Sequence, residues 1–298
     1  MLDASIRVRQ TYRDMLDHRD GFEMLPSAVK DYSDLTVHVW QSAGSKDAFA
    51  RNGEVIVKAV AATIMTKPDE TWLVITHKRS SKVPDVERQV RAALPKQGGP
   101  QVAFLTFGSH MATNDHSEVQ NVILAGQFFT PMAHTVALTH AAQGRPFASG
   151  MASSAEIEAT RRGELADVTL QAIARGRCRK SVGPKAAAMD AYIIATVQSG
   201  VPGALKDIFP GCQLKAWEPV RKVLRGNVLR AIIHLREAFT AGAVSVAYKA
   251  IYRALAMTSG NFCKEVSQTD EWRRAVASEG WEIRRGARRV LSVSPVGG

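Results

Sequence analysis

The sequence feature that most constrains the fold is a series of short, almost wholly apolar segments. Such segments are typical of strands that are buried on both faces of a parallel sheet. They are Thr71–Thr76, Gln101–Phe107, Val119–Ala125 (which ends at Gly126) and Asp190–Ala195. An alternating segment, Leu35–Trp40, predicts a further strand.

Helical patterns separate these strands, and strands that alternate with helices predict a doubly wound α/β sheet. The predicted helices are Glu54–Met65, Asp85–Leu94, Ala166–Arg175 and Pro202–Phe209. Asn52-Gly53 and Pro210-Gly211 are turn signals. We therefore expect an α/β domain over 35–218, preceded by a helical or linker segment over 1–34 that contains a helix at Tyr12–His18.

The character of the chain changes after Pro219, so we expect a second domain over 219–298. Its predicted helices are Val220–Phe239, Ser245–Ala256, a third from Asn261 and a fourth that Thr269 caps. Two short strands about an Arg-Gly turn follow Gly280. Helices followed by a basic hairpin indicate a winged helix-turn-helix domain.

Positive charge is concentrated toward the C-terminus. The net charge is +11, and residues 221–298 hold 14 Lys and Arg against 6 Asp and Glu. A second basic cluster lies just before, at Arg175, Arg177, Arg179, Lys180 and Lys185. A concentrated basic region indicates a polyanionic partner, nucleic acid first. The alternative is a basic surface without a partner.

The composition excludes several classes of protein. Apolar residues make up 45% and charged residues 22%, which excludes a disordered or fibrous chain. The three cysteines are far apart, which speaks against a zinc ribbon or a disulfide framework. No apolar run approaches the ~18 residues of a membrane span. We expect a cytoplasmic protein with no membrane partner and no metal site.

The segment Gln171–Arg179 (QAIARGRCR) carries the most specific pattern. Gln171 is followed four residues later by Arg175, and then by Arg177 and Arg179. Arginine makes forked contacts with phosphate oxygens, so such a group can stabilise charge that develops during phosphoryl transfer. The alternative is a solvated basic helix end.

The order of these segments resembles the second RecA-like domain of superfamily 2 DEAD/DEAH-type helicases, over about residues 35–217. WLVITHK resembles the strand and turn that open that domain, FGSHMATNDHSEVQNVILAG its motif V, and QAIARGRCR its motif VI. DAYIIATVQSGVPGALKDIFPGCQLKAW resembles the final strand-helix-strand. The resemblance implies a RecA-like fold and a helicase motor.

The resemblance also implies roles for individual residues. Those implied at the nucleotide are Gln171, Arg175, Arg177, Arg179 and Gly126, and those implied at nucleic acid are Gly108, Thr113 and Asn114. Thr113 and Asn114 can equally form a plain turn. The usual motif VI is Gln-x-x-Gly-Arg-x-x-Arg, whereas here Ala174 replaces the glycine and Cys178 the last arginine. Whether Arg177 or Arg179 takes its place stays open.

The phosphate cradle of a helicase is absent from the sequence. A P-loop contains a Gly-Lys dipeptide, and this sequence has none. Asp69-Glu70 precedes its strand and so is no magnesium-binding acidic box. The expected cofactors, ATP and magnesium, would therefore be shared with a partner, a first helicase domain or subunit that carries a P-loop. This chain alone would bind neither.

The C-terminal domain resembles a helix-turn-helix. In that interpretation Ser259, Asn261 and Lys264 lie near the start of the recognition helix. Arg284, Arg285, Arg288 and Arg289 would form a basic wing on phosphates. The alternative is a helical accessory domain that packs on the motor or on a partner.

The sequence thus predicts the C-terminal half of an ATP-dependent superfamily 2 DNA helicase or translocase, inactive alone. One alternative is a non-enzymatic DNA-binding protein built on a degenerate helicase domain. Another is a subunit whose main partner is a protein. Neither a Gly-x-Ser-x-Gly elbow nor a metal-ligand spacing of histidines supports another chemistry.

Overall fold

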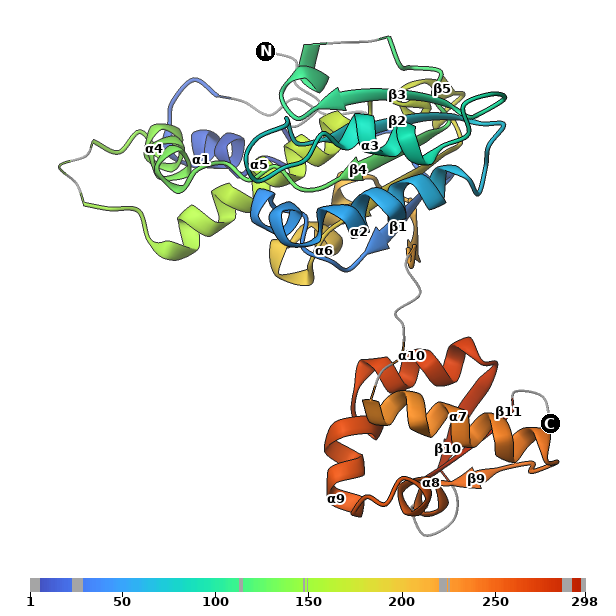
Figure 1. Cartoon of the computed structure of the whole chain (residues 1–298). Coiled ribbons are helices and arrows are strands. Elements are labelled where there is room, and N and C mark those ends of the chain that lie inside the picture. Colours follow the sequence, from blue (N-terminus) through green and yellow to red (C-terminus); the bar gives the residue numbers. More distant parts are fainter. Residues whose placement is uncertain are drawn as a thin grey trace. The chain divides into compact units, whose positions relative to one another are not determined.

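The computed structural model describes residues 6–22, 29–112, 115–146, 148, 150–219, 224, 226–285 and 291–295. The chain divides into two compact units, residues 1–220 and 221–298 (Figure 1). We refer to them as unit 1 and unit 2.

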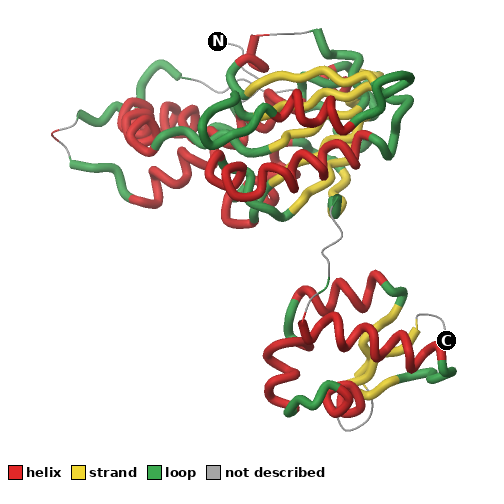
Figure 2. The backbone as a smooth tube through the Cα atoms, viewed as in Figure 1, coloured by secondary structure: helices red, strands yellow, loops and turns green. Residues whose placement is uncertain are grey.

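Unit 1 is built on a six-stranded sheet in which every neighbouring pair is parallel (Figure 2). The strand order is β3-β2-β4-β7-β1-β8. The strands are β1 (Leu35–Trp40), β2 (Thr71–Thr76), β3 (Gln101–Thr106), β4 (Asn121–Ala125), β7 (Met189–Ile194) and β8 (Gln213–Ala216). The prediction of an α/β fold with a parallel sheet flanked by helices is confirmed.

Helices cover both faces of the sheet, which explains why its central strands are apolar on successive residues. One face packs on α2 (Lys46–Ile64) and α3 (Val86–Ala93) around Trp72 and Ile123. The other packs on α5 (Ser154–Ile173) and α6 (Val201–Ile208). Behind α5, α1 (Gln10–His18) and α4 (Met132–Gln143) form a further helical layer.

Several short elements connect this framework. They are the 3₁₀ turns η1 (Ser109–Ala112), η3 (Arg177–Arg179) and η4 (Val197–Ser199), and the antiparallel pair β5 (Ser181–Val182) and β6 (Lys185–Ala186).

Three features of unit 1 differ from the sequence-based expectation. Helix α2 begins at Lys46, where the Ser45 side chain accepts the Ala48 N–H, and it runs through Asn52-Gly53 with a kink instead of a turn. Helix α5 begins at Ser154, well before the expected start, because Ser153 and Glu156 form a capping box. Helix α4 has no counterpart in the prediction.

Unit 2 has its own core. Its elements are α7 (Gly226–Thr240), β9 (Val246–Ala247), α8 (Tyr248–Ala254), α9 (Ser259–Phe262), a turn of π-helix η5 (Cys263–Ser267), α10 (Asp270–Ser278), β10 (Trp281–Arg285) and β11 (Leu291–Pro295). The strands form a small antiparallel sheet in the order β10-β11-β9. The helices pack around Phe262 and Trp272. The indole N–H of Trp272 donates to the Tyr248 hydroxyl at 3.0 Å. The segment expected as one helix from Ser245 begins instead with strand β9.

Among the described residues, no helix has both the length and the apolar character that spanning a bilayer demands. The same residues contain no group of three or more His, Cys, Asp or Glu side chains that could hold a metal ion.

Candidate functional site

The end of helix α5 brings Gln171 and Arg175 together. Their spacing of four residues places both side chains on one helical face. The Arg175 guanidinium donates to the Gln171 side-chain oxygen at 3.2 Å and to the Gln171 backbone carbonyl at 3.2 Å. The glutamine therefore holds the arginine in one orientation.

The turn after α5 is fixed to the start of strand β4. The Arg177 N–H donates to the Val119 carbonyl at 2.9 Å. A Cβ atom at Gly176 would lie 2.5 Å from Met189 Sδ and 2.6 Å from Val122 Cγ2. Only glycine fits so close to these neighbours, so Gly176 allows the turn to lie directly on the sheet.

In turn η3, one side chain points into the core and the two on either side of it face solvent. Cys178 is fully buried in the core of unit 1, and burial raises the pKa of its thiol to about 12. Arg177 and Arg179, on either side, are exposed. The position at which the helicase pattern has an arginine is thus a core position here, and its two neighbours are the side chains that face solvent.

Arg175 and Arg179 interact electrostatically. Arg175 is half-buried; burial lowers its pKa, and the charge of Arg179 lowers it further. Next to them, Lys30 Nζ donates to the Arg179 carbonyl at 2.6 Å, and Lys180 forms an ion pair with Glu118. Arginines in such proximity repel one another, and a phosphate group between them would relieve that repulsion.

The turn that contains His110 packs against the helix that leads to this arginine group, a contact that the sequence analysis did not predict. Turn η1, which contains His110, packs against α5. His110 is buried; burial lowers the pKa of its ring, and the charge of Arg175 contributes in the same direction. The contact joins segments about 65 residues apart, so local spacing could not have revealed it.

Gly126 lies elsewhere. It follows the carboxyl end of β4, whereas Gly176 and Arg177 contact the residues at the amino end of that strand. Its φ of +124° suits glycine, and a Cβ there would lie 2.9 Å from both the Gly44 oxygen and His77 Nε2. The structure therefore does not bring Gly126 together with Arg175.

A cleft of about 350 Å³ opens at the carboxyl ends of β2 and β3, in front of the N-terminus of α3. Clefts outside the carboxyl ends of parallel strands are the usual place for ligands in open α/β sheets. The polar side chains that line it are Thr76, His77, Lys78, Arg79, Asp85, Glu87, Thr106 and Ser109. Both charge signs are present, so the cleft can accept and donate hydrogen bonds as well as bind anions.

His77 forms the inner wall of this cleft. The ring is 4% exposed, and its Nε2 lies 2.9 Å from the Gly44 carbonyl oxygen. Burial lowers the pKa of His77, and nearby Lys46 acts in the same sense. The ring is therefore neutral at pH 7 and donates its single proton to Gly44.

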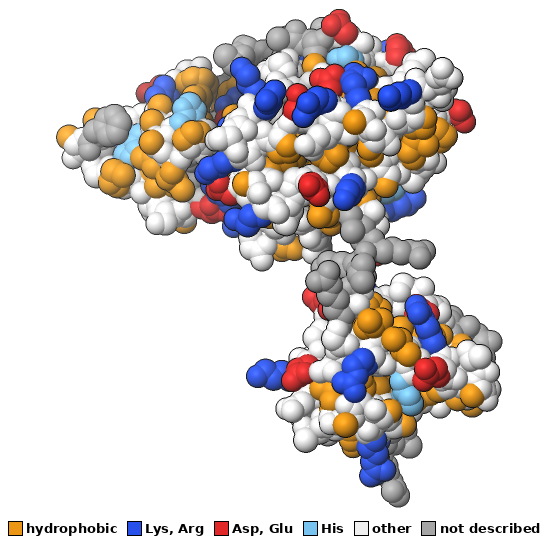
Figure 3. Space-filling model, viewed as in Figure 1, with side chains coloured by type: hydrophobic (Ala, Val, Ile, Leu, Met, Phe, Trp, Pro, Cys, Tyr) orange, Lys and Arg blue, Asp and Glu red, His pale blue; other side chains and the backbone are white. Residues whose placement is uncertain are grey.

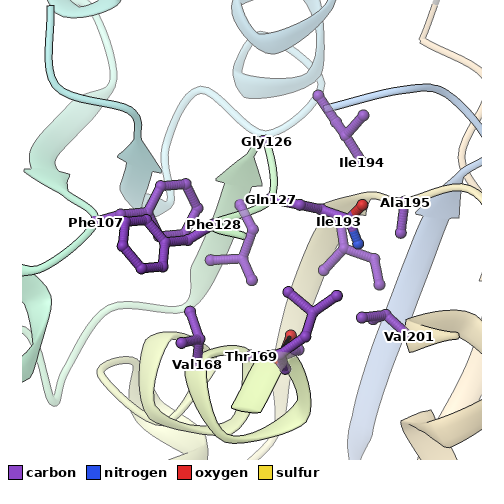
Figure 4. Close-up of a pocket in the computed structure, with 12 residues that line it drawn as sticks. Phe107, Gly126, Gln127, Phe128, Val168, Thr169, Ile193, Ile194, Ala195 and Val201 are labelled. Carbon is purple, nitrogen blue, oxygen red and sulfur yellow. Dashed lines mark hydrogen bonds between the residues drawn. The ribbon is translucent and has the colours of Figure 1, made fainter. Parts of the chain in front are cut away.

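A second, closed pocket lies between the ends of β4 and β7 and the middle of α5 (Figure 4). In this view Phe107 and Phe128 lie against one another, and Val168 and Thr169 approach from α5. Its volume of about 10 Å³ has room for about one water molecule. Apolar side chains make up most of its lining.

The remaining predicted residues of unit 1 are those of the motif V resemblance. Gly108 is exposed just after β3, with a φ of +101°. Thr113 and Asn114 lie outside the described residues.

In unit 2, Ser259, Asn261 and Lys264 are all exposed, on α9 and on η5. Arg284 is exposed but forms an ion pair with Glu282 on the same strand. The Arg285 side chain and residues Arg288 and Arg289 lie outside the described part of the chain.

Much of the basic charge of unit 2 is compensated locally. Arg236 pairs with Glu279, and Arg273 pairs with Asp270 at 3.0 Å. On the face drawn in Figure 3, the Lys and Arg side chains of unit 2 are scattered, some with acidic neighbours. Among the described basic residues of unit 2, Arg236, Arg273 and Arg284 are thus each paired with a carboxylate.

Comparison with known proteins adds no family. Neither a protein-family model nor a curated protein matches this chain.

Proposed function

We propose that this chain is the second RecA-like half of a superfamily 2 DNA helicase or translocase, completed by a partner domain that carries a P-loop. The observation that carries the proposal is the arginine group at the end of α5. Gln171 orients Arg175, while Gly176 and the buried Cys178 hold Arg177 and Arg179 outward.

The proposed chemistry is stabilisation of charge. ATP and magnesium, held by the partner, would supply the phosphoryl group and its activation. Arg175 would donate to the phosphate oxygens where negative charge develops, and its bond to Gln171 reduces the reorganisation that this requires. An exposed arginine of η3, Arg177 or Arg179, would supply a second contact.

The fold is compatible with this proposal. A parallel sheet with helices on both faces fits a RecA-like domain. In unit 2, helices followed by β10 and β11 fit a winged helix-turn-helix domain. Both assignments go beyond the α/β class itself and are part of the proposal.

The carboxyl-edge cleft is the proposed DNA contact of unit 1. Lys78 and Arg79 line the cleft and can pair with phosphates. In unit 2, the exposed Ser259, Asn261 and Lys264 are proposed to reach base edges or phosphates.

A second function is favoured by one observation, the absence of a Gly-Lys dipeptide. Without a partner, the chain would be a non-enzymatic DNA-binding protein with an inherited motor fold. A measurement of ATP hydrolysis distinguishes the two functions, because only the helicase function gives Arg175 a role in hydrolysis.

The test is to mix the chain with a first helicase domain that carries a P-loop and to measure ATP hydrolysis with and without DNA. We expect stimulation that Arg175→Ala reduces by about 10³-fold, the lower range for an arginine finger. Arg88→Ala, which removes an exposed arginine of α3, is the matched control and should retain stimulation. DNA binding without any stimulation of ATP hydrolysis would refute the helicase function and would support a non-enzymatic DNA-binding protein.

A further inference from the structure

Two neighbouring residues that line the carboxyl-edge cleft each have a buried polar atom without a hydrogen bond. Thr76 is 5% exposed and His77 is 4% exposed, and both line the cleft. Neither Thr76 Oγ1 nor His77 Nδ1 has a partner among the described residues. Buried polar atoms are nearly always paired, so two unpaired atoms in one cleft need an explanation. A ligand in the cleft would supply both partners.

The Thr76 side chain lies on the side of the sheet at which the cleft opens. Side chains alternate between the two faces of a strand, so Thr76 shares its face with Trp72 and Val74. Those two side chains pack in one cluster with Val86 of α3, which also lines the cleft. Thr106, the residue paired with Thr76 in β3, is another lining residue. The hydroxyl thus lies at the base of the cleft, at the carboxyl end of β2.

The His77 ring offers a hydrogen-bond acceptor. Its Nε2 lies 2.9 Å from the Gly44 carbonyl oxygen, and a carbonyl can only accept, so the proton of the neutral ring is on Nε2. Nδ1 therefore accepts and needs a donor from the ligand, whereas the Thr76 hydroxyl can donate or accept. A matching ligand carries an N–H or O–H group with a second polar atom beside it.

The rest of the lining is apolar on the walls and charged toward solvent. The apolar lining residues are Pro84, Val86, Phe104 and Leu105. Lys78 is exposed. The two carboxylates of the lining are already engaged, since Asp85 accepts the Arg88 N–H at 3.1 Å and Glu87 pairs with Arg91 at 2.9 Å. A ligand with apolar faces, a polar edge and a negative charge fits this arrangement.

We propose that the cleft is a nucleobase pocket, in which an unstacked base of single-stranded DNA bonds Thr76 and His77 while its phosphate pairs with Lys78. A base has two apolar faces and a polar edge, and proteins read unstacked bases through both. Thymine, for example, has an N–H donor between two carbonyl oxygens, which matches an acceptor beside a hydroxyl. The volume of about 350 Å³ is within the range of small-molecule sites. This inference rests on the proposed function, since it specifies how DNA occupies the cleft.

The test compares two oligonucleotides of equal length, oligo(dT) and an abasic strand, in titrations of the full chain. Hydrogen exchange of residues 74–88 measures occupancy of the cleft itself, so binding elsewhere on the chain does not interfere. The two strands carry the same phosphates and differ only in their bases. We expect oligo(dT) to protect this segment at a midpoint concentration about tenfold lower than that of the abasic strand, within the range for the contact of one base.

Thr76→Val removes the unpaired hydroxyl and keeps the shape of the side chain. The midpoint concentration for oligo(dT) should rise about fivefold, as expected for one lost hydrogen bond, while that for the abasic strand stays within about twofold. Because the hydroxyl has no partner in the free protein, the urea midpoint of the variant should not fall. Thr240→Val, at the exposed end of α7, is the matched control and should behave as wild type.

Two further variants separate the base contact from the phosphate contact. His77→Phe keeps a ring against Phe107 but removes Nδ1, so it should also weaken the binding of oligo(dT) and not of the abasic strand. Lys78→Ala removes a charge that both strands meet, so it should raise both midpoint concentrations by the same factor.

Equal midpoint concentrations for the two strands, or equal losses for both in Thr76→Val, would overturn the nucleobase pocket alone. The phosphate contact of the proposed function would then stand, provided that Lys78→Ala weakens both strands. If neither strand protects residues 74–88 of the wild-type chain, the DNA contact of the proposed function is overturned, and this inference with it.

Discussion

Gly176→Ala tests whether the arginine turn depends on its close contact with the sheet. The new Cβ would lie 2.5 Å from Met189 Sδ, 2.6 Å from Val122 Cγ2 and 3.2 Å from the Val119 oxygen. Overpacking of this kind costs about 1–3 kcal/mol. A shift of the turn would also lengthen the bond from the Arg177 N–H to Val119, worth about 1 kcal/mol. The expected loss in the free energy of unfolding of unit 1 is therefore about 2–4 kcal/mol.

Native-state hydrogen exchange of strands β4 and β7 measures this loss in unit 1 without interference from unit 2. At about 1.36 kcal/mol per tenfold, exchange limited by global opening should accelerate roughly 30- to 900-fold. Gly203→Ala in α6 is the matched control, since a Cβ there meets no atom within 4 Å and alanine favours a helix. If the exchange rates of Gly176→Ala stay close to those of wild type, the turn can move away from the sheet at little cost, and its close contact with the sheet does not stabilise unit 1.

Three further predictions concern the stability of unit 1. Burial lowers the pKa of His77 and of His110 below the ordinary 6.5 in the folded state. As pH falls below 6.5, the unfolded chain therefore binds more protons than the folded chain does, and the folded state becomes less stable. Urea midpoints should therefore decline from pH 7.5 to pH 5, and less so in His77→Phe; equal slopes would contradict this. Asp190→Asn removes the negative charge that pairs with Lys67 Nζ at 2.6 Å, and should lower the free energy of unfolding in urea by about 1.5–3 kcal/mol; no change would show that solvent screens the pair. Ser153→Ala removes the N-cap of α5 and should lower the free energy of unfolding by about 1 kcal/mol, whereas an unchanged urea midpoint would show that the capping box contributes nothing.

The sheet could be predicted from the sequence because its central strands are buried on both faces. Such strands are apolar at successive positions, as in Leu73–Ile75 and Val122–Leu124, and no helix partner is needed to recognise them. Helix α4 escaped prediction for the opposite reason. Its buried positions include Thr135, Thr139 and His140, so the interior face carries no apolar period. The Thr139 hydroxyl instead donates to Thr160 at 2.9 Å, a contact that only the fold creates.

In the candidate site, too, contacts between residues close in the sequence could be predicted, whereas contacts between distant segments could not. The pair Gln171 and Arg175 lies within one helical turn, so its spacing alone indicates that the two side chains meet. The outward direction of Arg177 and Arg179 depends on Cys178 being in the core, which the alternation of residue types suggests but does not require. The approach of His110 depends on how the chain returns from β3, and no spacing in the sequence encodes it.

The position of β1 between β7 and β8 has a consequence for synthesis. Its neighbours are β7 and β8, and the residues paired in β1 and β7 lie about 150 positions apart in the chain. A ribosome that adds about 5–20 residues per second leaves β1 without either neighbour for roughly 8–30 s. Strands β2, β3 and β4 can pair earlier, since they adjoin one another and are made in succession. During that interval both edges of β1 are unpaired, and unpaired strand edges are sites at which other chains can add.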